Sequence, residues 1–206
     1  MAQLFSLHPD NPQQRLIKQA VELVRQGNVI VYPTDSAYAL GCRLGDKNAL
    51  QTIHRIRQLD AKHNFTLVCR DLSELSRYAR VDNSTYRLLK AYTPGAYTFI
   101  LKATSEVPRL MMHPKRKTIG LRVPDHKVVD ALLAELDEPL LSSTLILPGE
   151  TDAPVDLEEI TKVLGHEVGA ILESGYCGNE PTTVVDLSEI EPVLLRQGKA
   201  DGTPFL

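Results

Sequence analysis

The sequence predicts an α/β fold in which a twisted mixed sheet is flanked by helices. Short runs rich in β-branched and aromatic residues alternate with segments whose apolar residues recur every three or four positions. The alternation is irregular, so we expect a mixed sheet rather than a strict series of parallel βαβ units. The 206 residues, 43% of them hydrophobic, contain no internal repeat or low-complexity linker, and we expect one domain over residues 1–206.

Six segments carry helix signals. In the first, Pro12 stands at the first helical position and Gly27 provides the stop. In the second, Asp46 is the N-cap, and apolar residues follow at intervals of three from Leu50 to Ile56. The other four helices are expected at residues 71–79, 84–92, 125–136 and 157–165.

The expected strands lie between these helices. The first, residues 28–32, follows the first helix directly and is apolar enough to be buried. The others are expected at residues 65–70, 97–103, 118–123, 139–145, 168–173, 182–187 and 192–196. Irregular loops at 104–117, 146–156 and 173–181 are the places where a site is most easily built.

Composition and missing motifs exclude several classes of protein. No apolar run approaches the roughly 18–20 residues of a membrane span, and the N-terminus lacks the features of a signal peptide, so we expect a cytoplasmic protein with no membrane partner. Cys42, Cys69 and Cys177 are too few and too widely spaced for a disulfide framework or a zinc site. The histidines show no ligand spacing, and no metal site is expected. Phosphate-loop and dinucleotide-binding glycine motifs are missing, so any nucleotide must be held in another way.

The net charge of −3 hides a strong asymmetry along the chain. Residues 1–127 contain 20 Lys and Arg against 10 Asp and Glu, whereas residues 128–206 contain 3 against 16. This polarity favours a basic face that attracts phosphate, nucleotide or RNA. The alternative, in which the two halves interleave in the fold, stays open.

A polar turn follows the first strand. Pro33 ends the strand, and Thr34, Asp35 and Ser36 come directly after it. Their side chains could cap the next segment or hold a ligand, and such residues are most common in caps and turns.

Three arginines differ in their expected surroundings. At about 100° per residue, Arg57 lies at the edge of the apolar stripe of the second helix, so it either snorkels past the core or points into a cleft. Arg55 points nearly opposite that stripe, toward solvent. Arg122 lies in a strand between Leu121 and Val123, where an arginine needs an anionic partner.

Consecutive basic residues occur in one loop. Such a cluster is usually a solvated tip, and it contacts nucleic acid only beside other basic surface. The candidates for RNA binding are Arg55, Lys115, Arg116 and Lys117.

Five segments, in the same order, resemble those of the YrdC-like family, which has the threonylcarbamoyl-AMP synthase fold. They are residues 32–42, 93–101, 119–126, 182–187 and 195–198, and the similarity extends over about residues 13–200. The resemblance implies a single α/β domain with a concave basic surface. In active relatives it implies an adenylation: threonine and bicarbonate form a carbamate whose carboxylate attacks the α-phosphate of ATP, pyrophosphate leaves, and the product serves the modification of a tRNA adenosine. Such chemistry depends on positioning and on charge neutralisation by arginine, lysine and the Mg²⁺ that accompanies ATP.

The resemblance also assigns residues to ligands. Those assigned to threonine are Thr34, Cys69, Arg122 and Thr182. Those assigned to the nucleotide, ATP or another phosphate ligand, are Arg57, Asn64, Ser142, Thr144 and Arg196. Asp35 and Ser36 keep a structural role.

The sequence departs from the family at three places. Active relatives have a Lys-x-Arg pair where Arg57 and Leu59 stand, and Ser-x-Asn where Thr144 and Ile146 stand. Cys69 occupies the place of a histidine that some relatives bring to the amino acid. Each lost charge-assisted bond is worth about 1.5–3 kcal/mol, so we expect a weak or altered synthase activity. The alternative is a module that binds tRNA or double-stranded RNA without catalysis.

Overall fold

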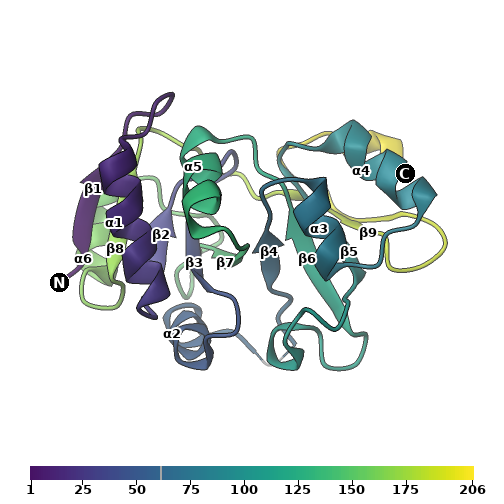
Figure 1. Ribbon diagram of the computed structural model, residues 1–206, viewed down its shortest axis with the longest axis horizontal. Coiled ribbons are helices and arrows are strands. Elements are labelled where there is room, and N and C mark those ends of the chain that lie inside the picture. The colour runs from purple at the N-terminus through teal and green to yellow at the C-terminus, as the bar shows by residue number, and fades with distance from the viewer. Residues whose placement is uncertain (61) are drawn as a thin grey trace.

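One ten-stranded mixed sheet runs through the computed structural model, which describes residues 1–60 and 62–206 (Figure 1). The strands are β1 (Gln3–Ser6), β2 (Ile30–Tyr32), β3 (Ala39–Arg43), β4 (Thr66–Val68), β5 (Tyr97–Lys102), β6 (Thr118–Arg122), β7 (Leu140–Thr144), β8 (Ala170–Glu173), β9 (Thr183–Asp186) and β10 (Val193–Arg196). Their order is β1-β8-β2-β3-β7-β4-β6-β5-β9-β10. Four neighbouring pairs are parallel and five are antiparallel, which confirms the predicted mixed sheet.

All six expected helices are present. They are α1 (Gln14–Arg25), α2 (Lys47–Arg57), α3 (Leu72–Tyr78), α4 (Asn83–Tyr92), α5 (Lys127–Leu136) and α6 (Leu157–Leu164), with short 3₁₀ turns η1 (Arg109–Met111) and η2 (Thr203–Phe205). Asp46 caps α2 as predicted, since its side chain accepts a hydrogen bond from the Ala49 amide at 2.9 Å. The predicted start of the first helix is wrong: α1 begins two residues after Pro12, and its N-cap residue is Gln13.

Two strands were not expected from the sequence. β1 is a short edge strand that pairs in parallel with β8. β3 contains Ala39 and Gly41, which are poor strand formers, and it is held by antiparallel pairing on both sides, with β2 and β7. A Cβ at Gly41 would lie 2.8 Å from Cε1 of Tyr32, so the glycine lets the tyrosine ring cross β3.

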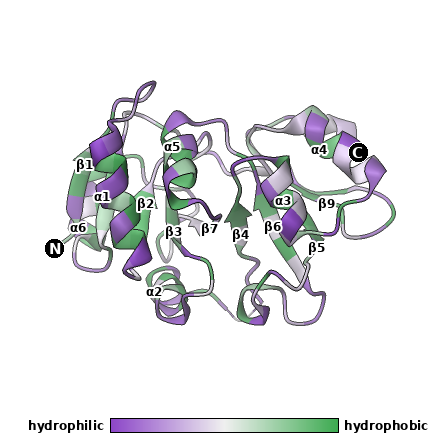
Figure 2. Cartoon of the chain, in the orientation of Figure 1, coloured by the Kyte–Doolittle hydropathy of each residue, from purple (hydrophilic) through white to green (hydrophobic). Residues whose placement is uncertain are grey.

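Alternate strand residues divide the sheet into two faces. On one face, Tyr32 and Val68 belong to the hydrophobic cluster that α1 and α5 cover. On the other, Val31 and Leu67 belong to the larger cluster packed by α2, α3, α4 and α6. In Figure 1, α1 and α5 lie in front of the sheet on the left, and α3 and α4 lie in front of it on the right. The first pair of helices nevertheless covers the opposite face from the second pair, because the sheet twists between them. Figure 2 shows β4 and β6 as largely hydrophobic, whereas α1 and α3 carry both hydrophilic and hydrophobic residues.

The face under α1 and α5 is covered over only part of its width. The cluster beneath these helices draws its strand residues from β1, β2, β3, β4, β7 and β8. Among the described residues it includes none from β5, β6, β9 or β10. We call this uncovered part of the sheet the open face; it carries Thr98, Gly120 and Val184.

The basic and acidic halves of the chain interleave. Five of the eight ion pairs found in residues 1–60 and 62–206 join a basic residue of the first 127 to an acidic residue of the rest. They are Arg43–Glu138, Arg55–Glu167, Arg70–Asp137, Lys102–Glu189 and Arg116–Asp186. The charge asymmetry of the sequence is therefore partly neutralised by the fold. Within the described residues, every helix is too short or too polar to cross a membrane.

Truncation of Ile53 tests the packing of α2 against the sheet. Ile53 is fully buried, and we expect Ile53→Ala to lower the free energy of unfolding by about 2–5 kcal/mol, because it leaves a cavity in the larger core. Urea denaturation measures this change. Gln51→Ala, on the exposed side of the same helix, is the matched control and should change it by less than about 0.5 kcal/mol. Equal effects of the two substitutions would contradict this packing.

Candidate functional site

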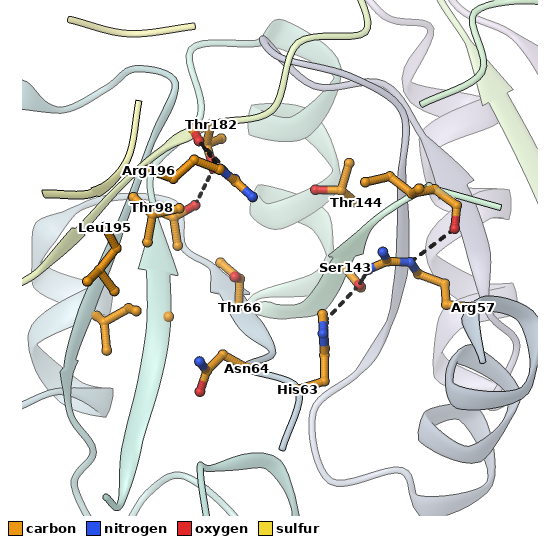
Figure 3. A pocket seen from close by; sticks show the side chains of 14 residues that line it. Arg57, His63, Asn64, Thr66, Thr98, Ser143, Thr144, Thr182, Leu195 and Arg196 are labelled. Atoms are coloured by element: carbon orange, nitrogen blue, oxygen red, sulfur yellow. Dashed lines mark hydrogen bonds between the residues drawn. The ribbon is translucent and has the colours of Figure 1, made fainter. Parts of the chain in front are cut away.

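A cavity of about 360 Å³ opens on the open face of the sheet (Figure 3). Nine of the residues that line it have polar or charged side chains. The lining residues are Arg57, His63, Asn64, Thr66, Thr98, Ile100, Gly120, Ser143, Thr144, Ile146, Thr182, Val184, Leu195 and Arg196. Five of the nine residues that the family resemblance assigns to threonine or the nucleotide are among them: Arg57, Asn64, Thr144, Thr182 and Arg196.

The floor of the cavity is the backbone of the sheet. Thr66 pairs with Gly120, and Gly120 pairs with Ile100, so these residues lie side by side on neighbouring strands and on the same face. A Cβ at Gly120 would lie 2.8 Å from Oγ1 of Thr66 and 3.2 Å from Cγ2 of Thr98. Only glycine leaves room at this point, and it keeps the floor of the cavity low.

Arg57 forms one wall of the cavity. It is the last residue of α2, and Gln58 turns the chain away in the left-handed conformation. Its Nη1 donates to Oγ of Ser143 at 2.5 Å and its Nε to the carbonyl oxygen of Ile146 at 3.3 Å. Of the two orientations that the sequence leaves open, the structure has the one that points into the cleft.

Arg196 approaches from the other side of the cavity (Figure 3). A β-bulge in β10 shifts the register so that Arg196 lies opposite Val184, whose side chain faces the cavity. The Nε and Nη2 atoms of Arg196 donate to the carbonyl oxygen of Thr182 at 3.0 and 2.8 Å. The Thr182 hydroxyl is 2.7 Å from that of Thr98. These bonds fix the plane of the Arg196 guanidinium group beside the cavity.

The electrostatics of the cavity favour an anion. Burial lowers the pKa of Arg57 and Arg196, because desolvation disfavours their charged forms. Arginine still stays protonated at neutral pH. Among the described lining residues there is no carboxylate to neutralise these charges. An anion that enters the cavity could therefore bind two partly desolvated guanidinium groups without first displacing a carboxylate of the protein from them.

His63 also lines the cavity, although no pattern in the sequence selected it. Its Nε2 lies 3.3 Å from Oγ of Ser143, and its ring packs edge-on against Phe65 with centroids 5.2 Å apart. Burial lowers the pKa of His63 to about 4, and the nearby charge of Arg57 acts in the same direction. The one signal that could have found it is its position next to Asn64, which the resemblance does assign to the nucleotide.

The sequence also did not select Thr66, Thr98 and Ser143. Thr66 could have been found from the alternation of the expected strand at 65–70, where it faces away from the buried Leu67. Thr98 and Ser143 are ordinary strand residues in the sequence, and only the pairing of the sheet brings them to the cavity.

Thr34 lies outside the cavity lining. Its hydroxyl donates to the carbonyl oxygen of Ala37 at 2.6 Å and accepts from the amides of Ser36 and Ala37 at 3.1 and 3.2 Å. These bonds close a turn, so the threonine is 1% exposed and its hydrogen-bonding capacity is used within the turn. The assignment of Thr34 to the amino acid stays a prediction.

Arg122 has its anionic partner within the chain. Its Nη2 forms an ion pair with Oδ1 of Asp35, and its Nη1 donates to Oγ of Ser36 at 3.2 Å. The second oxygen of Asp35 accepts from the Asp125 amide at 2.9 Å. Arg122 lies on the same face of β6 as Gly120 and is one alternation beyond the cavity floor.

Two other assigned residues also lie away from the lining. Cys69 is 1% exposed and belongs to the hydrophobic cluster on the opposite face, where burial raises the pKa of its thiol. Ser142 is buried beside Thr66, its partner on β4, with its hydroxyl 2.6 Å from the Tyr32 hydroxyl and donating to the Leu40 carbonyl oxygen at 3.1 Å. The neighbouring Ser143 reaches the lining instead.

The RNA-binding candidates divide into two groups. Arg55 pairs with Glu167 at 2.5 Å, and Arg116 pairs with Asp186 at 2.6 Å. Lys115 and Lys117 are exposed in the loop before β6. The four residues do not form one unneutralised basic surface.

The Arg122–Asp35 pair can be tested by substitution. Both side chains are largely buried, at 8% and 13% exposed, so Asp35→Ala leaves a buried charge without its partner. We expect a loss of about 3–5 kcal/mol in the free energy of unfolding, measured by urea denaturation. The double variant Asp35→Ala/Arg122→Met should recover much of this loss, because it removes the unpaired charge. Additive losses in the double variant would contradict the pairing.

The sequence and the fold agree with those of a known class of protein. The family model Sua5_yciO_yrdC, described as "Telomere recombination", matches residues 22–198. The chain therefore belongs to the Sua5/YciO/YrdC family, and it is related to the threonylcarbamoyl-AMP synthases.

Individual relatives place the chain within this family. It is 59% identical over 206 residues to the uncharacterized protein YciO of Escherichia coli K12, with all of both chains covered, and the crystal structure of E. coli YciO superposes with a TM-score of 0.97. A threonylcarbamoyl-AMP synthase of Vibrio vulnificus YJ016 is 29% identical over 88% of this chain and 98% of its own. The crystal structure of P. abyssi Sua5 complexed with L-threonine shares the fold, with a TM-score of 0.87 and 24% identity over 96% of this chain and 58% of that one.

Proposed function

We propose that the cavity binds ATP with its phosphates between Arg57 and Arg196, and that the protein catalyses a slow adenylation of the threonylcarbamoyl-AMP synthase type. The observation that carries the proposal is the pair of arginines reaching into the cavity from two sides, without a carboxylate among the described lining residues. Guanidinium groups bind phosphate oxygens through paired, charge-assisted hydrogen bonds.

The hydrogen bonds within the chain orient both arginines without using all of their donors. Arg57 uses Nε and Nη1, and Arg196 uses Nε and Nη2. Within residues 1–60 and 62–206, Nη2 of Arg57 and Nη1 of Arg196 make no hydrogen bond. In the proposal these two groups donate to phosphate oxygens, and because their planes are already fixed, little conformational entropy is lost on binding.

The amino acid would lie beside the nucleotide, near Thr182. Its carboxylate would face Arg122, whose Nε is buried and has no hydrogen-bond partner among the described residues. Placed in this way, the carbamate formed from threonine and bicarbonate could reach the α-phosphate, and the arginines would neutralise the charge that develops as pyrophosphate leaves.

Mg²⁺ would enter this site with ATP. The described residues contain no group of three or more His, Cys, Asp or Glu side chains that could hold a metal ion, and the cavity lining offers hydroxyl, amide and guanidinium groups. This donor set fits a metal ion held mainly by phosphate oxygens, with the help of hydroxyl groups and water. When bound, the ion would supply charge neutralisation at the phosphates.

Two apolar residues support a slow reaction. Leu59 is packed against the larger hydrophobic cluster, and Ile146 adds an apolar side chain to the cavity. Each replaces a polar contact that the family resemblance implies. With losses of about 2 kcal/mol at each position, adenylation would be roughly a thousandfold slower.

Nucleotide binding tests the proposal directly. We expect calorimetry to detect binding of MgATP, and Arg196→Gln to weaken it about 10- to 100-fold, since a charge-assisted contact is worth about 1.5–3 kcal/mol. Arg55→Gln is the matched control, because Arg55 is exposed and lies outside the cavity, and it should bind ATP normally. Incubation with ATP, threonine, bicarbonate and Mg²⁺ should release pyrophosphate slowly. Absence of both ATP binding and pyrophosphate release would refute the proposal.

The exposed lysines support a second candidate function, binding of tRNA or double-stranded RNA. Lys115 and Lys117 lie close together on one exposed loop, and no ion pair of either lysine occurs among the described residues. If this loop binds phosphates, RNA affinity should fall with salt, and Lys115→Gln/Lys117→Gln should reduce the slope of log K against log salt by roughly one unit for each lysine that binds a phosphate. Filter binding over a salt series measures this slope. Binding that is insensitive to salt would exclude the candidate.

A further inference from the structure

We propose that His63 is a ligand-dependent cation of the cavity: it is neutral in the free protein and becomes protonated when a polyphosphate lies between Arg57 and Arg196. This inference rests on the proposed nucleotide site and specifies how that site recognises phosphate. The ligand class is a nucleoside polyphosphate or an inorganic polyphosphate, and its binding would take up a proton from solvent.

A chain of hydrogen bonds joins His63 to Arg57 through Ser143. Arginine has only donors, so the 2.5 Å contact between Nη1 of Arg57 and Oγ of Ser143 makes the serine oxygen an acceptor. The single hydroxyl proton of Ser143 is then free to point toward Nε2 of His63, which lies 3.3 Å away. When Nε2 accepts this proton, the ring is neutral and carries its own proton on Nδ1. The Ser143 oxygen has a second acceptor site, so a protonated ring can instead donate Nε2–H to it.

The surroundings of His63 keep it neutral while the cavity holds no anion. The ring packs edge-on against Phe65, whose ring also packs against His54 with centroids 5.1 Å apart. Burial is the main reason that the pKa of His63 is lowered to about 4; the charges of Arg57 and His54 lower it further, and Asp60 opposes them. The protonation equilibrium of His63 therefore depends on its charged or titratable neighbours Arg57, His54 and Asp60 and on its hydrogen-bond partner Ser143.

A polyphosphate would reverse this balance. Among the described lining residues, only Arg57 and Arg196 carry a full positive charge at neutral pH. A triphosphate without Mg²⁺ has more negative charge than two guanidinium groups can neutralise, and its Mg²⁺ complex still brings negative charge beside the imidazole. Its oxygens would offset the charge of Arg57 and add an opposite charge near the imidazole, and both effects favour the protonated ring. Nε2–H then becomes a donor and adds a third cationic contact to the phosphates.

The sign of the pH dependence follows from linkage. Between the pKa of His63 in the free protein and its higher pKa in the complex, the complex binds more protons than the free protein. Affinity therefore rises as pH falls through this window and levels off below about 4, where His63 is protonated in both states. ATP itself titrates, so the contribution of His63 is the difference between the wild-type protein and a variant that cannot gain the proton.

Calorimetry with MgATP, in two buffers of different ionisation enthalpy near neutral pH, measures this proton uptake. His63→Gln is the informative variant, because the amide oxygen can still accept from Ser143 but cannot bind a proton. His166→Gln, at an exposed position outside the cavity, is the matched control. We expect the wild-type protein and His166→Gln to take up a larger fraction of a proton than His63→Gln. The ratio of wild-type to His63→Gln affinity should rise by up to about tenfold for each pH unit lowered within the window.

Nuclear magnetic resonance of the wild-type protein provides a second measurement that does not depend on a variant. The Cε1–H signal of His63 should titrate near pH 4 without ligand and at a higher pH with MgATP or tripolyphosphate. ATP binding with equal proton uptake in all three proteins, or a His63 titration that ATP does not move, would overturn this inference while the nucleotide site stands. Failure of the wild-type protein to bind ATP would overturn both.

Discussion

The site depends on the incomplete covering of one face of the sheet. Helices α1 and α5 bury this face at one end of the ten strands, and the hydrophobic cluster beneath them includes none of the described residues of β5, β6, β9 or β10. An exposed sheet face must carry polar or small side chains, and here Thr66, Thr98 and Gly120 take these positions. The opposite face is packed by four helices, so the strands are held rigidly while their open side forms the floor of a cavity.

Two arginines in the walls of the cavity, Arg57 and Arg196, are held in place by hydrogen bonds within the chain. The contacts of Arg57 with Ser143 and of Arg196 with Thr182 fix both guanidinium planes and leave donors that can meet a ligand. Such preorganisation is what anion binding requires, because the entropic cost of ordering long side chains has been met during folding. Leu59 adds no charge nearby, and besides the two arginines His63 is the one described lining residue that could become a cation.

Electrostatic pairing within the chain limits the other charged groups. Arg55 and Arg116 are paired with acidic residues from the second part of the chain. Arg122 pairs with Asp35 through Nη2, while its Nε has no partner among the described residues. The strong charge asymmetry along the sequence therefore leads to ion pairs between distant segments of the same chain. Among the described lining residues of the cavity, Arg57 and Arg196 have no carboxylate beside them, and a site of this size suits a small polyanion better than a long nucleic-acid backbone.

The sequence alone determined the mixed α/β class, all six helices and most strands, because capping residues and apolar periodicity are local signals. The family resemblance of the sequence also selected five residues that line the cavity: Arg57, Asn64, Thr144, Thr182 and Arg196. Only the tertiary structure decided the remainder. β3 is a strand because its neighbours pair with it. Arg196 faces the cavity because a bulge shifts the register of β10. Ser143 and His63 meet because α2, β7 and the segment before β4 converge. These features arise from contacts between residues far apart in the chain, which no local pattern encodes.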